Sequence, residues 1–483
     1  MLGHAVPGLD PFAPGTDARD ALVDRASRAG GLARRDGEPA FAAVTVPLGA
    51  ELDPSALVLA ARRPEDTFAC FEQPDRAGFA LAALGQSALI ERDGPDRFAE
   101  AARRARSLAR RVVAGDPADD QAAPAASGPL FVGGFAFAPG GGRGPEWSSF
   151  APLRLVLPEL SIARHRGQAR LTLCSRVDGD DTPEAVLGRV RARLAQLAPA
   201  AIPLIDPDPL ERPRVASAAP PAHYEEAVRR AVERIRGGEL EKLVLAREVR
   251  VHAPRRLDPA PLLGALREVF PSCFCYCVGT PEAAFVGASP ELLLRREGAR
   301  AQTVALAGTT RRSADPAVDD HLGEQLLQSR KDREEQRIVA TRIERTLDPV
   351  SLWTAAAERP GLVKVQNVQH LATPIRAQLR EPLPAIELAG LLHPTPAVGG
   401  EPREPALPLI PALEGMDRGW YAGGVGWTDL AEDGEFCVAL RCALLRGRVA
   451  HLYAGCGIVG ESDPSAELTE SEVKLQALLP LLA

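Results

Sequence analysis

The stretch GELEKLVLAR, residues 238–247, contains a short apolar run, LVLA, of the kind that predicts a buried β-strand. A strand here places Lys242 on the same face as Leu240, Val244 and Ala246. An ammonium group would then lie among apolar side chains in a segment whose pattern predicts burial. Such a lysine normally extends its amine to water or pairs with a carboxylate; the alternative is an amine that burial keeps uncharged.

Strand-like segments recur before residue 200, mixed with Arg/Ala-rich stretches of helical periodicity. They are FAAVTVPL (41–48), GPLFVGGFAFAP (128–139), LRLVLPEL (153–160) and ARLTLCSRV (169–177), and a helix is predicted over RFAEAARRARSLARRVVAG (97–115). Further along, HYEEAVRRAVERIRGG (223–238) predicts a helix that ends at its two glycines. Strands in runs, with helices grouped between them, favour an α+β fold over strict βαβ alternation.

Two stretches rich in Pro and Ala interrupt this pattern. Residues 114–129 predict an exposed loop, and residues 198–222 predict a linker or boundary, because their many prolines cannot join a regular hydrogen-bond ladder. The chain has 483 residues, which exceeds the usual single core, so length alone suggests two or three domains.

The composition is that of a soluble globular protein, with 45% hydrophobic and 25% charged residues. The net charge of −7 and the lack of a long basic run argue against nucleic-acid binding. The amino terminus shows no secretion signal, and the longest apolar segment, FALAALGQSALI (79–90), is too short to span a membrane. The eight cysteines have no zinc-like spacing, so we expect buried, reduced thiols in a cytoplasmic protein.

The carboxyl-terminal segment SAELTESEVKLQALLPLLA predicts a final helix. Its spacing places Glu467, Glu470 and Lys474 on one face. Such a charged face is usually one that is simply solvated.

A second helix, predicted over residues 318–347, presents Asp332 and Glu335 three positions apart in the same way. Two helices that each offer a carboxylate pair can bind a hard divalent ion through oxygen ligands. Mg²⁺ suits this arrangement because it takes few protein carboxylates and keeps water or substrate in its other positions.

Ten segments that occur in family order resemble the chorismate-binding enzymes. That family contains isochorismate, salicylate, anthranilate and aminodeoxychorismate synthases. The segments are GELEKLVLAR (238–247), FVGASPELLLRR (285–296), ALAGTTRR (305–312), SRKDREEQ (329–336), QHLATP (369–374), LLHPTPAVGG (391–400), RGWYAGGVGW (418–427), ALRCA (439–443), YAGCGIV (453–459) and AELTESEVK (466–474).

The resemblance implies one large α+β unit, the chorismate-utilising enzyme fold, in which helices surround two stacked antiparallel β-sheets. It therefore overrides the length-based expectation of separate domains. Residues 219–481 would form the chorismate-binding catalytic region. Residues 1–205 match loosely, chiefly at FVGGFAF, and would form the amino-terminal part of the sandwich.

Within the family, the closest resemblance is to the isochorismate synthases. Enzymes of the family that deliver ammonia to chorismate carry a glutamine at the position of Lys242, and the water-adding branch carries lysine. Aminodeoxychorismate synthases place a nucleophilic lysine where this chain has Ala307. The Leu-Leu-Glu-Ser motif of feedback-regulated anthranilate synthases is absent from the amino-terminal region.

The resemblance implies the conversion of chorismate to isochorismate, in which water adds at C2 and the C4 hydroxyl leaves. This chemistry requires a base and an acid. Lys242 would be the base, with burial favouring its uncharged amine, and Glu291 would be the acid, with a pKa raised so that it stays protonated. From the sequence alone, Glu291 could equally be a structural carboxylate that begins a helix after Ser289-Pro290.

The same resemblance assigns the metal and substrate contacts. Mg²⁺ would lie between Glu335 and Glu470, with Glu467 and Asp332 acting through waters, and it would meet the ring carboxylate of the substrate. The substrate-binding residues would be Gly308, Thr309, Tyr421, Arg441, Gly455 and Lys474.

Two further residues near the site carry no assigned role. His370 would lie near the ring or be a satisfied core histidine. Cys456 departs from the GAGIV that is common in the family, and we expect the small side chain to be tolerated.

Three other functions stay open. A salicylate synthase would share these residues and also eliminate pyruvate from isochorismate. A non-catalytic chorismate sensor should have lost Lys242 or Glu291, and an anthranilate synthase with a glutaminase partner should lack Lys242. We therefore expect a monomer that needs no glutamine amidotransferase subunit, whose product feeds menaquinone or siderophore biosynthesis.

Overall fold

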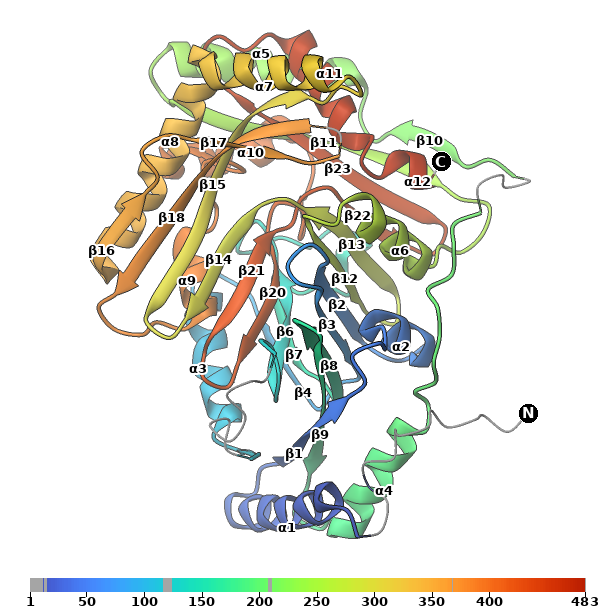
Figure 1. Ribbon diagram of the computed structural model, residues 1–483. Helices are drawn as coiled ribbons and strands as arrows, with labels where there is room; N and C mark the ends of the chain where they lie inside the picture. Colours follow the sequence, from blue (N-terminus) through green and yellow to red (C-terminus); the bar gives the residue numbers. More distant parts are fainter. Residues whose placement is uncertain (1–11, 13–14, 116–123, 207–210, 367, 483) are drawn as a thin grey trace.

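The computed structural model describes residues 12, 15–115, 124–206, 211–366 and 368–482. Within them, two β-sheets share a buried core, and helices cover the outer surfaces and ends of the sheets (Figure 1). This arrangement confirms the predicted α+β fold with two stacked sheets.

The first sheet contains thirteen strands of the described chain. Its order is β10 (Arg214–Ser217), β11 (Lys242–His252), β23 (Val449–Ile458), β22 (Cys442–Arg446), β13 (Ala283–Ser289), β12 (Phe274–Gly279), β2 (Phe68–Gln73), β3 (Phe79–Leu84), β8 (Leu160–His165), β9 (Gln168–Val177), β1 (Ala40–Leu48) and β5 (Val112–Val113), and β19 (Gly400–Glu401) pairs with β11. The β1–β5 pair is parallel, whereas the pairs β1–β9 and β11–β23 are antiparallel.

The second sheet contains ten strands of the described chain. Its order is β16 (Ser351–Ala356), β18 (Val368–Leu379), β15 (Arg300–Arg311), β14 (Leu292–Glu297), β21 (Gly434–Val438), β20 (Gly424–Asp429), β6 (Leu130–Phe135), β7 (Leu153–Leu157) and β4 (Ala88–Arg92), and β17 (Gly361–Lys364) pairs with β18.

Strands from the two ends of the chain meet inside both sheets. In the first sheet β2 pairs with β12, and in the second β6 pairs with β20. Each sheet therefore needs strands from both sides of residues 198–222. The boundary between residues 1–205 and 219–481 stays a prediction.

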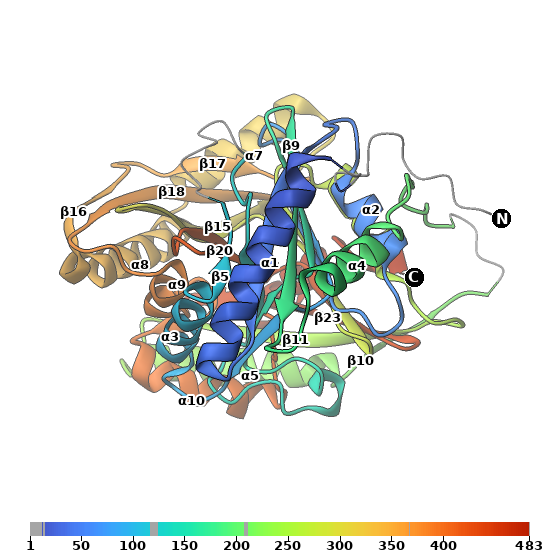
Figure 2. The same ribbon diagram turned by 90° about the horizontal axis from the view of Figure 1, so that it is seen from below.

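The helices divide according to the surface that they cover. The outer face of the first sheet carries α1 (Asp17–Asp36), α2 (Pro54–Ala61), α4 (Pro183–Leu194), α6 (Pro259–Val269) and α12 (Leu479–Leu482). The second sheet carries α3 (Arg97–Ala109), α7 (Pro316–Gln328), α8 (Arg330–Leu347) and α9 (Ala385–Leu392), and the helices around β11 and β23 are α5 (Pro221–Arg236), α10 (Arg403–Glu414) and α11 (Pro464–Leu475). Figure 2 shows α1 and α4 side by side over β9.

The core between the sheets is rich in aromatic rings. Trp420 packs edge-on against Phe150, with ring centroids 5.0 Å apart, and Trp147 packs against Phe285 at 5.4 Å. All four side chains are buried, and such contacts add specific geometry to the hydrophobic burial that stabilises the sandwich.

The helix predicted over residues 318–347 is two helices, α7 and α8. Ser329 separates them, because its hydroxyl accepts a hydrogen bond from the backbone N–H of Asp332 and so caps α8. The prediction missed this cap, which depends on a single hydroxyl group. The predicted final helix is likewise divided, into α11 and α12.

Two predicted boundaries around β11 also differ. The proline-rich stretch 198–222 includes strand β10, which pairs with the far end of β11. The strand predicted from residue 238 begins only at Lys242, so Leu240 precedes it.

The expectations about membranes and cysteines have simple outcomes. None of the described helices combines the length and apolar composition that crossing a bilayer requires. All eight cysteines are buried free thiols, as expected.

Candidate active site

A pocket lies between helices α8 and α11, which pack on different sheets (Figure 1). The space inside it is about 880 Å³ when the open mouth is included. The predicted site residues that line it are Glu291, Gly308, Thr309, Glu335, Tyr421, Arg441, Gly455, Glu470 and Lys474. The other two predicted residues contact the lining: Lys242 contacts Glu335, and Glu467 contacts Lys331.

Lys242 is the first residue of β11, and its side chain is fully buried. Its Nζ lies 2.8 Å from Oε1 of Glu335, in an ion pair whose ammonium is not aligned for a hydrogen bond. The lysine is buried, as expected, but apolar residues are not its only neighbours. A carboxylate from α8 faces the amine, which agrees with the expectation that such a lysine pairs with a carboxylate.

Gly457 makes room for this contact. It lies opposite Val244 in the β11–β23 ladder, and a Cβ there would be 2.3 Å from Oε1 of Glu335 and 2.9 Å from Cε of Lys242. A larger residue would have to displace one of these side chains. Sequence reasoning did not single out Gly457, although it is the second glycine of GCGIV.

Glu291 lies between strands β13 and β14, so the alternative of a carboxylate at the start of a helix is wrong. Its backbone N–H donates to Oγ of Ser289, and its carbonyl accepts from the N–H of Val438. The side chain is 3% exposed, and this burial raises its pKa to about 8, although nearby Lys242 acts to lower it. At neutral pH the carboxyl group is mostly protonated and can act as a proton donor.

Caps set the direction of the two acidic helices. Ser329 caps α8 and also donates from its hydroxyl to the Asp332 carboxylate. Helix α11 begins after Asp463, whose carboxylate accepts from the N–H groups of Ser465 and Ala466. These caps orient the first turns, which carry Asp332 and Glu467.

Three carboxylates that these helices bring to the site have shifted pKa values. Burial raises the pKa of Glu467, and nearby Glu470 adds to the effect. Burial likewise raises the pKa of Asp332, and nearby Glu335 and Glu470 raise it further. The hydrogen bond from Ser329 acts in the opposite direction, because it stabilises the charged carboxylate. Burial also opposes ionisation of Glu470, but Lys474 and Lys331 outweigh it and lower its pKa.

Each of the three glutamates predicted to bind metal is paired with a lysine. Besides the Lys242–Glu335 pair, Nζ of Lys474 lies 2.8 Å from Oε1 of Glu470. Nζ of Lys331 lies 3.2 Å from Oε1 of Glu467. Lys331 was not selected from the sequence, although it immediately precedes Asp332 in SRKDREEQ.

The donor set fits a hard divalent cation. It offers carboxylate oxygens from two facing helices. Burial raises the pKa of Asp332 and Glu467, and repulsion from neighbouring carboxylates adds to the effect. A cation would relieve that repulsion. Ligand atoms of Glu467, Glu470 and Cys456 already lie within 4.8 Å of one another. The Cys456 thiol donates to the carbonyl of Glu467 instead, and burial raises its pKa.

Arg441 is held by His370 and keeps one unsatisfied group. Its Nη2 donates to Nε2 of His370 across 2.8 Å, and its buried Nη1 has no hydrogen-bond partner among the residues that the structure describes. Burial and the Arg441 charge hold the pKa of His370 well below its usual value, so the ring is neutral and can accept this bond. Nδ1 of the ring lies 3.1 Å from Oγ1 of Thr309.

The pocket lining also includes Gly455, Lys474 and Tyr421. The N–H of Ala246 donates to Glu414 rather than to β23, so the Ala246–Gly455 pair is not hydrogen-bonded and the N–H of Gly455 points away from β11. The Gly455 carbonyl accepts from Lys474 across 2.9 Å. A Cβ at Gly455 would lie 2.9 Å from Oη of Tyr421, whose pKa burial raises, so the phenol stays a donor.

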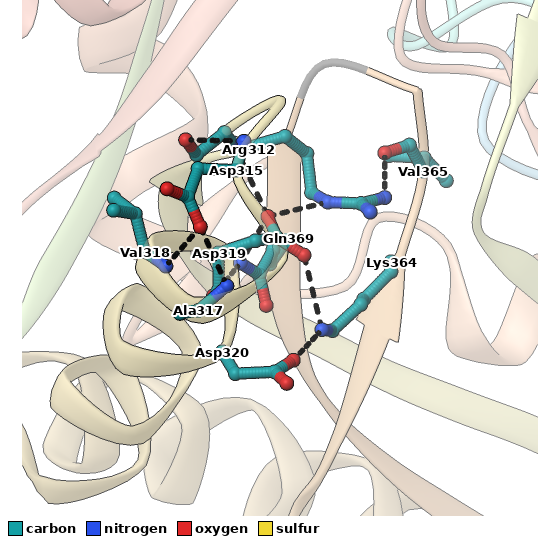
Figure 3. A network of polar contacts seen from close by, with 10 residues as sticks. Arg312, Asp315, Ala317, Val318, Asp319, Asp320, Lys364, Val365 and Gln369 are labelled. Carbon is teal, nitrogen blue, oxygen red and sulfur yellow. Dashed lines mark hydrogen bonds and ion pairs between the residues drawn. The ribbon is translucent and has the colours of Figure 1, made fainter.

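A polar network fixes the pocket wall that carries Thr309 and His370 (Figure 3). Asp319 of α7 accepts from Arg312 at the end of β15, from Lys364 of β17 and from Gln369 of β18. Because Gln369 directly precedes His370, this carboxylate ties one helix to three neighbouring segments of the wall.

A second network fixes β11. Glu414 and Arg418 form a buried ion pair at the end of α10. Nη2 of Arg418 donates to the carbonyl of Val244, and Glu414 accepts from the N–H of Ala246. These side chains bond β11 where neither β19 nor β10 pairs with it. Sequence reasoning missed both residues.

Comparisons with known proteins agree on one family. The family model described as "Chorismate binding enzyme" matches residues 25–483. The chain is 35% identical to the salicylate biosynthesis isochorismate synthase of Pseudomonas aeruginosa, over 98% of this chain and 97% of that protein.

Solved structures extend the likeness to three dimensions. The menaquinone-specific isochorismate synthase MenF of Escherichia coli has a TM-score of 0.77 and 27% identity, covering 96% of this chain and 99% of that one. Anthranilate synthase component I of Streptococcus pneumoniae has a TM-score of 0.64 at 18% identity, covering 92% of each chain, and shares the fold.

Proposed function

The chain belongs to the chorismate-binding enzyme family, and from this premise we propose that it is an isochorismate synthase. It converts chorismate reversibly to isochorismate, an isomerisation in which water adds at C2 of the ring and the C4 hydroxyl leaves. The observation that carries the proposal is the buried carboxyl group of Glu291 in the same pocket region as the buried amine of Lys242.

Glu291 is the general acid. Hydroxide is a poor leaving group, so the C4 hydroxyl must receive a proton as its bond to carbon breaks. A carboxyl group with a pKa of about 8 carries that proton at neutral pH, and the apolar burial that raises the pKa also excludes competing water.

Lys242 is the general base for the attacking water. Its ammonium makes an ion pair with Glu335 but no aligned hydrogen bond among the described residues. As a neutral amine it takes a proton from the water that adds at C2, and the ammonium that results is paired with Oε1 of Glu335. The second oxygen of Glu335 remains available to a cation.

The enolpyruvyl carboxylate is bound by four groups: the side chains of Arg441, Lys474 and Tyr421 and the backbone N–H of Gly455. Nη1 of Arg441 is buried without a partner in the described chain, which costs free energy unless a ligand accepts from it. A carboxylate matches the guanidinium geometry. Gly308 and Thr309 line the same pocket beside His370.

Glu335, Glu470 and Glu467 would hold Mg²⁺, with Asp332 nearby. When bound, Mg²⁺ neutralises the ring carboxylate and withdraws electron density from the ring diene. Four carboxylates would otherwise repel a dianionic substrate, which is the reason to place a cation here.

The test is incubation of the purified chain with chorismate and Mg²⁺, followed by separation of the products. An isochorismate synthase accumulates isochorismate without pyruvate. Salicylate and pyruvate in equal amounts would instead identify a salicylate synthase, and no conversion would reject both functions.

The chain acts alone, as a cytoplasmic monomer, with no glutamine amidotransferase subunit. Lys242, at the position where the ammonia-using relatives carry glutamine, supports this part of the proposal. Full activity of the isolated chain without glutamine or ammonium, and a single-chain mass by light scattering, would test it. The product would feed menaquinone or siderophore biosynthesis.

A further inference from the structure

Lys331 has no part in the acid–base chemistry or in the substrate contacts assigned above. It lies in the first turn of α8 and lines the pocket. Its Nζ donates to Oε1 of Glu467 across 3.2 Å, which joins α8 to α11.

The two partners of this ion pair differ in burial. The Glu467 side chain is 3% exposed, whereas that of Lys331 is 37% exposed. A buried carboxylate needs a nearby cation, because isolating its charge from water is costly. A half-exposed lysine can rotate into water at little cost. Lys331 is therefore the partner that can leave.

The other two lysines of the cluster are less free to move. Lys242 is fully buried at the start of β11. Lys474 donates to the carbonyl of Gly455 as well as pairing with Glu470. Of the three ion pairs between lysines and predicted metal ligands, only the Lys331–Glu467 pair has a half-exposed cation.

We propose that Lys331 is an internal counter-ion that neutralises Glu467 in the metal-free pocket and competes with the divalent cation for that carboxylate. It thereby stabilises the pocket before metal binds and lowers the affinity of the site for metal. The inference rests on the proposed magnesium site and adds to it a residue that sets its affinity.

The physical reason is repulsion between two cations on one carboxylate. A divalent ion near Glu467 must displace the ammonium or remain beside it, and either course costs free energy at the effective dielectric of a protein pocket. Replacing Lys331 by an uncharged residue of similar shape removes that cost. We expect Mg²⁺ to bind about tenfold more tightly, or more.

The experiment is calorimetric titration of Mg²⁺ into the metal-free full chain, without substrate, for the wild type and Lys331→Met. Arg337→Met is the matched control. It removes a positive charge from the same helix, where Arg337 pairs with Glu334 and both side chains are more than half exposed. We expect tighter binding in Lys331→Met, and affinities within about twofold of the wild type in Arg337→Met and Lys331→Arg.

A second readout does not depend on enzyme activity. Without metal, Lys331→Met leaves the buried Glu467 unpaired, so its Tm should fall below those of the wild type and Arg337→Met, and added Mg²⁺ should raise its Tm more than theirs. Lys331→Gln provides a second neutral variant if Lys331→Met does not fold.

Two outcomes would overturn the inference, and they are distinguishable. If wild type and Lys331→Met bind Mg²⁺ equally, or the variant binds it more weakly, the counter-ion role is rejected and the magnesium site stands. If neither protein binds Mg²⁺, the proposed metal site is rejected together with the counter-ion role.

Discussion

Two groups of buried charges lie beside strand β11, and they differ in how completely their polar atoms are bonded. In the Glu414–Arg418 pair, Arg418 donates to Glu414 and to the carbonyls of Val244 and Val398. In the pocket, Lys242 Nζ and Arg441 Nη1 are buried without a hydrogen-bond partner among the described residues.

This difference separates structural from chemical roles. Burying a charge is tolerated when every donor and acceptor is satisfied, and such a network then fixes the backbone around it. Unsatisfied buried donors cost free energy, and they are retained where a ligand completes the bonding. The comparison predicts that changes in the first group reduce stability, and that changes in the second reduce turnover.

The largest effect is expected for Lys242→Ala. Loss of the base should reduce kcat by roughly 10²–10⁴-fold, the usual contribution of general acid–base catalysis, while the circular dichroism spectrum and Tm stay close to those of the wild type. The fold tolerates the change because Glu335 lines the pocket and can be solvated. Steady-state kinetics with chorismate measures the effect, and near-normal turnover would remove Lys242 from the mechanism.

Arg418→Met should behave in the opposite way. It leaves the buried Glu414 unpaired and frees the carbonyls of Val244 and Val398, so the free energy of unfolding should fall by about 3–5 kcal/mol. Urea denaturation measures this loss. Unchanged stability with lost activity would contradict the structural role.

Glu470→Ala should affect metal and substrate together. The Mg²⁺ concentration for half-maximal activity and the KM for chorismate should both rise, by about tenfold or more, because one oxygen ligand and the partner of Lys474 are lost. Glu472→Ala, on the exposed side of the same helix, serves as control. An increase in KM alone would place the metal elsewhere.

The pH dependence should report the protonated state of Glu291. Its folded-state pKa of about 8 is raised above the ordinary 4.5, so between these values the folded protein holds a proton that the unfolded chain has lost. Stability should therefore fall as pH rises through this window, by up to roughly 1.4 kcal/mol per pH unit. Denaturation of the wild type and Glu291→Gln at several pH values measures the slope, which the variant should lack. Equal slopes would mean that Glu291 is ionised in the fold.

The smallest effect is expected for Asp319→Asn, in the wall network of Figure 3. Hydrogen bonding from Arg312 holds the pKa of Asp319 well below its usual range despite the opposing effect of burial. Its stabilising contribution is therefore present above a pH of about 4 and is lost as pH falls. The variant should melt below the wild type at pH 7, and the gap should close in acid. Differential scanning calorimetry at two pH values tests this.

The family, fold and pocket-lining residues could be predicted because they are carried by local motifs. The short apolar run around Val244 predicts a strand, and the helical spacing of Glu467 and Glu470 places them on one face. Ten segments in order identify the family. The pairing of Lys242 with Glu335 could not be predicted, because it joins a strand of one sheet to a helix on the other. Lys331–Glu467 likewise joins helices that pack on different sheets. Glu414 and Arg418 are only four residues apart, and what the sequence could not predict is their contacts with β11.

Some local features were also missed. Ser329 breaks the predicted helix through a single hydroxyl, which apolar periodicity does not register. Gly457 matters only because Glu335 approaches its Cα in the fold. Its neighbour Gly455 could be selected from the sequence through the family motif, whereas no spacing rule distinguishes Gly457 from a glycine of an ordinary strand.

Isotope incorporation tests most directly the claim that Lys242 and Glu291 add water across this pocket. Chorismate is incubated in ¹⁸O-labelled water with Mg²⁺, and the isochorismate is analysed by mass spectrometry for the wild type and Lys242→Ala. The account predicts one solvent oxygen at C2 of the wild-type product, and labelled product from the variant at a rate lower by roughly 10²–10⁴-fold. Isochorismate that forms without the label, or labelled product at the wild-type rate from Lys242→Ala, would contradict it.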